Sequence, residues 1–330
     1  MDSPRTVTKP EEVTLTRRRE LPLWVGVWGQ VVKRKPLAAF GLAIVALLLI
    51  VGIFADFIAP EGLNEPHPDR VEALDEAGRK ELVGPSFSHP FGLDNLGRDV
   101  LSRVIFGARV SMLVALGTVA LGTGLGTVVG MLSSWLGGKA DTFIQRIVDG
   151  MMVFPWLVVL IVIVTMLPNQ SPVPFLSIFY WAMAKVIFSL GILNIAWISR
   201  VVRSAAMATK ENQYVDAARA LGGSGWRINL RHILPNIMAP IITIATLGLG
   251  FAILSEATLS FLGHGIPPPF PSWGGMLTTT GQQYLHRAPW LAIFPGVMII
   301  LVVFGINVLG DGLRDLLDPR LKGKSGRFGA

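Results

Sequence analysis

The stretch that decides the fold runs from Val110 to Gly138 and reads VSMLVALGTVALGTGLGTVVGMLSSWLGG. It contains no Asp, Glu, Lys or Arg. A helix needs about 20 apolar residues to cross a bilayer core of about 30 Å, because each residue advances the helix by about 1.5 Å. This stretch is therefore long enough to cross a membrane as one helix.

Further uncharged stretches of similar length occur along the chain. They cover residues 37–55, 150–184, 236–255 and 288–310. The second is interrupted by prolines and polar residues at 168–174, which break a helix. We therefore expect one helix near 145–167 and another near 178–203. The sequence predicts an all-α membrane protein with six transmembrane helices.

The overall composition agrees with this fold class. Hydrophobic residues make up 51% of the chain and charged residues only 15%, against about 25% charged residues in soluble domains. Because there is no cysteine, a disulfide scaffold, a thiol nucleophile and a thiolate zinc site are excluded. The five histidines are scattered and form no metal-binding motif, so we expect neither metal ligands nor catalytic residues.

The formal net charge of +7 indicates the orientation in the membrane. If the N-terminus is cytoplasmic, eight basic residues lie in 1–36, two in the 136–146 loop, six in 199–235 and five after Gly310. Basic residues favour the cytoplasmic side of a membrane. We therefore expect a multi-pass protein of the cell inner (plasma) membrane with both termini cytoplasmic, and no nucleic-acid partner.

The remaining segments follow from these spans. The first 36 residues are expected to form a cytoplasmic tail. Within this tail, residues 21–32 resemble an interfacial helix with tryptophan anchors. The alternative is that these residues extend the first span. No cleavable signal peptide is expected, because the first apolar run starts only at Leu37. The other expected segments are a first transmembrane helix at 37–59, an extracytoplasmic loop at 60–98, a core with spans two to six at 99–313 and a cytoplasmic tail at 314–330.

One face of the second span is built from small residues. Gly122, Gly126 and Gly130 are four residues apart, so they lie on the same side of a helix. Small residues at this spacing let another helix approach closely. The pattern predicts a tightly packed helix neighbour and does not by itself indicate a pore.

Charged residues close to the membrane form a second group. Arg146 and Asp149 are three residues apart at the start of the third span, which is the spacing of a helical side-chain pair. We interpret them as a structural charge pair. Lys185 and Glu256 also fall within spans, and structural pairing is the favoured interpretation for both.

The most informative segment lies between spans four and five and reads NQYVDAARALGGSGWRINLRHILPN from Asn212 to Asn236. Residues 216–221 begin a helix that the following glycines end, and 226–232 form a second short helix that is expected to end before Pro235. Two short helices outside the membrane form a compact projection that suits a socket on a partner protein. An ordinary surface hairpin is the alternative.

These residues resemble the coupling-helix motif of the integral membrane subunits of ABC importers. The matching positions are Asp216, Ala217, Ala218, Gly222, Leu234 and Pro235. The usual glutamate is Asp216 here, and the usual apolar residue two positions before Leu234 is His232. Segments 89–109 and 259–276 are similar to signatures of the C-type subunit of the dipeptide/oligopeptide permease subfamily, although His264 stands where an apolar residue is usual.

The resemblance implies a type I ABC importer (MetI-like) permease fold, with 204–235 as the cytoplasmic coupling loop. It also implies a homologous B-type permease subunit, two ABC ATPase subunits, an extracytoplasmic solute-binding protein and membrane lipid as partners. ATP and Mg would bind to the ATPase subunits, so this chain is expected to be non-catalytic and to hold no cofactor. The implied mechanism is alternating access driven by ATP.

Several alternatives stay open at this point. The substrate could be a dipeptide, a longer peptide, a nickel chelate or a saccharide. An ion-driven secondary transporter and a membrane-embedded hydrolase are the competing function classes. The proline-rich segment 267–271, with Trp273 and the acidic 60–95 loop, is interpreted either as an outer rim that docks a binding protein or as a rigid cap.

Overall fold

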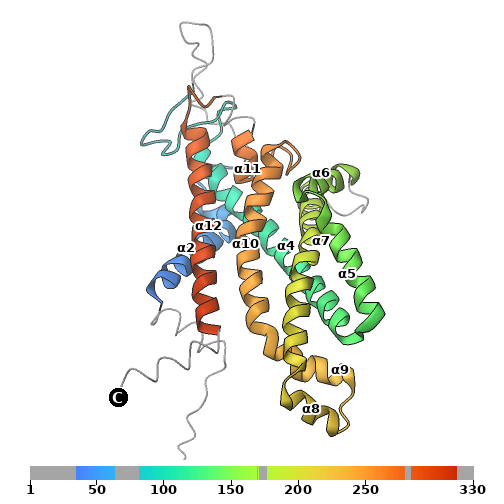
Figure 1. Cartoon of the computed structure of the whole chain (residues 1–330). Coiled ribbons are helices and arrows are strands. Elements are labelled where there is room, and N and C mark those ends of the chain that lie inside the picture. The colour runs from blue at the N-terminus through green and yellow to red at the C-terminus, as the bar shows by residue number, and fades with distance from the viewer. Residues whose placement is uncertain (1–34, 64–81, 169, 171–176, 279–283, 318–330) are drawn as a thin grey trace, which may run out of the picture.

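The computed structural model describes residues 35–63, 82–168, 170, 177–278 and 284–317 (Figure 1). The interfacial helix expected at 21–32 lies outside these residues, as does most of the C-terminal tail. Five helical spans within the described ranges are long and apolar enough to cross a membrane. They are α2 (Pro36–Ile53), α4 (Val100–Leu136), α7 (Ile178–Lys210), α12 (Trp290–Leu317) and Gly225–Phe261, which ends in α10 (Met238–Phe261).

The third expected span is broken, which corrects the expectation of one helix near 145–167. It consists of α5 (Gly138–Val153) and α6 (Trp156–Met166), which meet at an angle of 93°. Pro155 lies between them; it has no N–H to donate and it forces the preceding Phe154 into an extended conformation. If the bent pair is one span, the described residues contain six spans.

Short helices connect and flank the spans. They are α3 (Ala55–Ile58), α8 (Gln213–Ala220), α9 (Gly225–Ile228), the π-helical turn η1 (Asn229–Ile233), the 3₁₀ turn η2 (Leu234–Ile237) and α11 (Trp273–Met276). Figure 1 shows α8 and α9 at one end of the molecule and α11 at the opposite end. The two ends of the bundle are therefore built differently.

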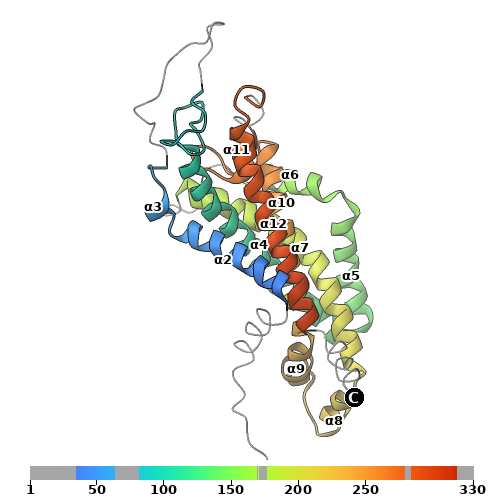
Figure 2. The same cartoon turned by 90° about the vertical axis from the view of Figure 1, so that its left-hand side faces the viewer.

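The spans pack as neighbours around α4 and α10. Helix α4 crosses the bundle obliquely and contacts α7, α10 and α2, while α2 lies along α12 (Figures 1 and 2). Lys35 and Asp315 join the α2 and α12 ends through a 2.7 Å ion pair. At the other end of α2, Arg109 donates a 2.7 Å hydrogen bond to Asp56, which holds the pKa of that carboxyl below its usual range.

The small-residue face of α4 packs directly against α7. A Cβ added at Gly122 would lie 2.7 Å from the Cβ of Asn194, and one at Gly126 would lie 2.8 Å from the Cβ of Ile198. At Gly130 the added carbon would lie 2.6 Å from the backbone oxygen of a residue in α7. The helices can approach this closely because the glycines have no side chain.

Ion pairs join α5 to α7 along their length, and they differ from the pair expected from the sequence. Asp149 pairs with Arg200 of α7 and not with Arg146. Near the start of α5, Asp141 accepts a 2.6 Å hydrogen bond from the Nε of Arg203. The spacing of Arg146 and Asp149 allowed a pair within α5, but the packing of α7 against this helix brings a second arginine closer.

Glu256 has no ion-pair partner in the described part of the chain. It is buried in α10, where Ser260 donates a 2.7 Å hydrogen bond to its Oε1 and Ser111 of α4 lies 3.4 Å from its Oε2. Serine hydroxyls therefore satisfy this carboxyl in place of the expected charge partner. The contact also joins α10 to α4.

We predict that Gly130→Ala destabilises the folded protein by about 1–3 kcal/mol, because the new methyl group would overlap the α7 backbone and push the helices apart. The measurement is the thermal unfolding midpoint of the purified protein in detergent. Gly124→Ala is the matched control on the same helix, since a Cβ there meets nothing within 4 Å. If both variants unfold at the same temperature, the glycine face does not determine helix packing.

Candidate functional site

The segment between α7 and α10 projects from one end of the helix bundle (Figure 1). We call residues 211–228, which include α8 and α9, the knob. Helix α7 continues to Lys210, so the projection begins later than the 204 boundary expected from the sequence. Its shape is two short helices joined by a glycine turn, as the sequence predicted.

The first helix of the knob ends in a glycine turn with a defined geometry. Gly222 has φ +79°, a left-handed conformation that glycine adopts without strain. The N–H of Gly223 donates to the oxygen of Ala218 at 3.0 Å, and the N–H of Gly222 donates to the oxygen of Arg219 at 2.9 Å. These two bonds are the Schellman motif, which satisfies carbonyl groups at a helix end. The glycine therefore sets the direction in which the chain turns toward α9.

The second helix does not end before Pro235, which corrects the expectation from the sequence. Helix α9 continues through η1 and η2 into α10, so Gly225–Phe261 forms one continuous helical span. Pro235 lies in the first turn of η2, where a missing N–H is tolerated. The second arm of the knob is thus the direct extension of a transmembrane helix.

The inner side of the knob packs against the ends of α4 and α7. The buried cluster there includes Val215, Ile228, Ile233, Ile237, Met131, Val202 and Ala206. The rings of Trp135 in α4 and Trp226 in the knob meet edge to face, with 6.0 Å between centroids. A Cβ at Gly225 would lie 2.6 Å from the indole nitrogen of Trp135. Because of this close packing, a displacement of the knob must displace α4 and α7 as well.

The outer side of the knob exposes apolar side chains. Leu221 at the glycine turn is 89% exposed, and Tyr214 and Trp226 are also exposed. Asp216 forms a 2.9 Å ion pair with Arg219 on this surface. Large apolar side chains exposed on a segment that projects from the bundle are candidates for contact with a partner protein.

The six motif residues divide between the two sides of the knob. Asp216, Ala217, Gly222 and Pro235 are exposed, while Ala218 and Leu234 are half-buried next to the cluster that anchors the knob. Sequence reasoning missed Leu221 and Trp226 as surface residues, because nothing in their spacing separates an exposed apolar residue from a buried one. Within the described ranges, no group of three or more His, Cys, Asp or Glu residues could hold a metal ion.

A large apolar cavity lies beside the bend between α5 and α6. Its volume is about 780 Å³, and it is bounded by the bend itself, by α7 and by α10. Phe154, Pro155, Trp197 and Phe251 contribute apolar surface, and Asn194 contributes a polar group. No pattern in the sequence indicates this cavity, because it forms only where the bent span diverges from the neighbouring helices.

The opposite end of the molecule is closed by the segment from Gly263 to Met276. Trp273 is fully buried there, and its indole N–H donates to the oxygen of Val104 at 3.0 Å. Trp273 therefore contributes nothing to an exposed outer rim, which was one of the two interpretations of this segment. Residues Pro267, Pro268 and Pro269 are exposed, as are Gly263 and His264, whereas the residues from Pro271 to Gly274 are buried.

Comparisons with known proteins agree on one family. The family model described as "Binding-protein-dependent transport system inner membrane component" matches residues 122–323, which is more than half of the chain. A second family model, "N-terminal TM domain of oligopeptide transport permease C", matches residues 23–74. The two matched regions together cover most of the transmembrane part.

Relatives named as transport permeases are similar to this chain over most of its length. The dipeptide transport system permease protein DppC of Alkalihalophilus pseudofirmus is 38% identical over 290 residues, which is 88% of each chain. The glutathione transport system permease protein GsiD of Pectobacterium atrosepticum is 35% identical over 300 residues, covering 91% of this chain and 92% of its own. Both relatives are therefore similar to this chain over most of its length and of their own.

A solved structure supports the fold. It is described as inward facing conformations of the MetNI methionine ABC transporter, and it aligns with a TM-score of 0.52 at 17% identity. The alignment covers 65% of this chain and 96% of that chain. At this level of identity the similarity concerns the fold alone.

We predict that Gly222→Val loosens the end of α8, because a β-branched residue in the left-handed region costs about 1–2 kcal/mol. Gly222→Asn is the matched control, since asparagine tolerates this conformation. The measurement is hydrogen exchange at the Gly223 amide, whose bond to Ala218 closes the turn. Exchange should accelerate several-fold in the valine variant only; equal rates in both variants would contradict the prediction.

Proposed function

Since the chain belongs to the family of binding-protein-dependent transport system inner membrane components, we propose that it is the C-type membrane subunit of an ATP-driven importer of peptides. The feature that carries the proposal is the knob, which is anchored to α4 and α7 on one side and exposes apolar residues on the other. This arrangement suits a surface that receives motion from a partner and passes it to the membrane spans.

The substrate class is supported by the relatives. Their names include dipeptide, peptide and glutathione transport, and all of these substrates carry peptide bonds or a peptide-like backbone. The apolar cavity beside the α5–α6 bend could form part of one wall of the transport pathway. A homologous B-type subunit would supply the other half of that pathway.

The proposed mechanism is alternating access. Two ATPase subunits bind ATP and Mg, and one of them receives the knob of this chain. When the ATPases close, they move the knob, and the continuous helix from Gly225 to Phe261 carries this movement into the membrane. The spans then reorient so that the pathway opens toward the external binding protein.

The proposed orientation places the knob in the cytoplasm and the proline turn outside. Four of the arginines and lysines that the structure describes at the knob end, Arg203, Lys210, Arg219 and Arg227, agree with the preference of basic residues for the cytoplasmic side. The alternative of an ion-driven secondary transporter is not supported, because the family and the similar proteins are binding-protein-dependent or ABC permeases.

We predict that Leu221→Asp reduces ATP-dependent peptide uptake by at least about tenfold, because a charge at the most exposed apolar position of the knob disturbs an apolar socket. The assay uses proteoliposomes that contain the complete transporter. Co-purification of the ATPase subunits with this chain gives an independent measure of docking.

Leu262→Ser serves as the control for this experiment. Leu262 is also an exposed leucine, but it lies at the outer end of α10, far from the knob. The Leu262→Ser variant should co-purify with the ATPase subunits to the same extent as the unmodified protein. If Leu221→Asp preserves both co-purification and uptake, the knob is not the coupling surface.

A further inference from the structure

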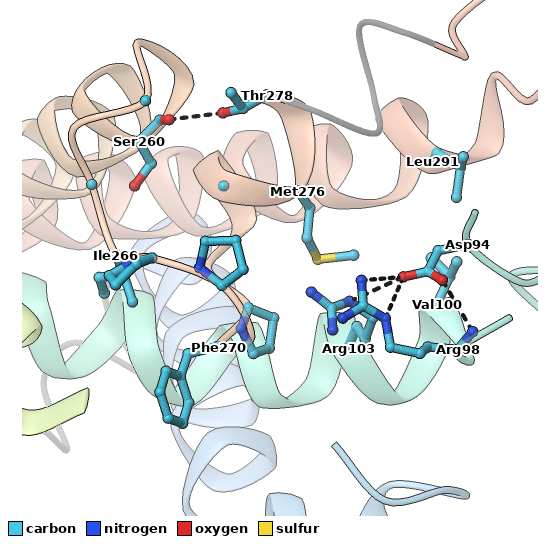
Figure 3. A pocket seen from close by; sticks show the side chains of 16 residues that line it. Asp94, Arg98, Val100, Arg103, Ser260, Ile266, Phe270, Met276, Thr278 and Leu291 are labelled. Carbon is cyan, nitrogen blue, oxygen red and sulfur yellow. Dashed lines mark hydrogen bonds and ion pairs between the residues drawn. The ribbon is translucent and has the colours of Figure 1, made fainter. Parts of the chain in front are cut away.

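A small cavity opens at the end of the molecule opposite to the knob (Figure 3). Its volume is about 250 Å³, and it lies between the start of α4, the proline turn, α11 and the start of α12. Figure 3 shows Phe270 and Ile266 on one side, and Asp94 with the two arginines Arg98 and Arg103 on the other. Two basic residues and one acidic residue are the charged groups that line it.

The hydrogen-bonding capacity of Asp94 is already used. Its Oδ1 accepts the backbone N–H groups of Leu96 at 2.8 Å and of Arg98 at 3.0 Å. Its Oδ2 accepts the Nε of Arg98 at 2.7 Å, and the Nη2 of the same arginine lies at 2.7 Å. A carboxylate has about four acceptor positions, so this one has little left for a second arginine.

Within the described residues, Arg103 is consequently left without a hydrogen-bonded counter-ion. Its Nε lies 3.6 Å from the Oδ2 of Asp94, beyond hydrogen-bond distance, although its side chain is only 10% exposed. Its Nη1 is buried and has no hydrogen-bond partner among the residues that the structure describes. A buried guanidinium whose only ion-pair contact is 3.6 Å long is costly unless another anionic group lies beside it, and Arg103 lines the cavity, which is the space where such a group could bind.

The remaining walls of the cavity are apolar. Met276, Phe270 and Pro268 face the same space, and Figure 3 shows the Met276 side chain extending toward the arginine head groups. A ligand that fits must therefore combine an anionic end with a compact apolar part. The planar fork of a guanidinium matches a carboxylate through two parallel hydrogen bonds.

We propose that this cavity binds the C-terminal residue of a transported peptide, with the peptide carboxylate on Arg103 and its side chain against Phe270 and Met276. The proposal rests on the proposed function, from which the peptide class is taken. A cavity of this size is smaller than the roughly 300–1,000 Å³ of sites for drug-sized ligands. It therefore suits the end of a chain rather than a whole peptide or a folded loop.

The test is equilibrium binding of trialanine and of trialanine amide to the complete transporter in nanodiscs, in the absence of the binding protein. The unmodified complex should bind the free acid about 10- to 100-fold more tightly than the amide, because one charge-assisted interaction is lost in the amide. Arg103→Gln should remove this preference, and Arg103→Lys should retain a part of it. Equal affinities in the unmodified complex would overturn the proposal.

Arg109→Gln is the control variant. It removes one positive charge from the same helix, so it shows whether a loss of charge or of folding alone would abolish the preference. Arg109 pairs with Asp56 outside the cavity, so this variant should keep the preference for the free acid. A preference that survives in Arg103→Gln, or that disappears equally in Arg109→Gln, would also overturn the proposal. If Arg103→Gln leaves the preference intact but weakens the complex with the binding protein, the occupant is a carboxylate of that protein and the peptide assignment is wrong.

Uptake assays separate this proposal from the proposed function. If the unmodified complex transports peptides with ATP but does not distinguish the acid from the amide, only the carboxylate site fails. If ATP-driven peptide uptake is absent altogether, the proposed function fails, whatever the binding experiment shows. The two outcomes are therefore distinguishable in one preparation.

Discussion

The close contact between α4 and α7 is the constraint on which the rest of the structure depends. In a bilayer, apolar helices gain little from leaving lipid, so van der Waals packing and hydrogen bonds must hold them together. The glycine face of α4 makes this packing close, with backbone atoms of α7 where a side chain would stand. The paired helices then form the base on which the knob is anchored, through Met131 of α4 and Val202 of α7.

Helix α4 also connects the two ends of the molecule. It has 37 residues and is therefore about 55 Å long, with Arg103 near its start and Trp135 near its end. The first of these side chains lines the small cavity, and the second packs against the knob. One continuous helix thus contacts the region proposed to meet the peptide and the region proposed to meet the ATPase.

Local patterns were sufficient to predict much of this architecture. The apolar runs predicted the spans, because a helix needs about 20 apolar residues to cross a bilayer. The glycines after Leu221 predicted the turn of the knob, because glycine adopts the left-handed backbone conformation without strain. The same reasoning failed at Pro155 and Pro235. Both residues break hydrogen bonds, yet one marks a sharp bend and the other begins a turn inside a continuous helix. The difference depends on the surrounding helices and on the turn that precedes each proline.

The amino-acid sequence alone was enough to locate the apolar segments, the class of fold and the position of the knob, because these properties depend on composition and on spacing along a helix. Only the tertiary structure decided the pairings across the bundle. It paired Asp149 with Arg200, surrounded Glu256 with serines and left Arg103, beside a cavity, without a hydrogen-bonded counter-ion among the described residues. These contacts join residues from different elements, and their distances depend on how the helices pack, which no local spacing specifies.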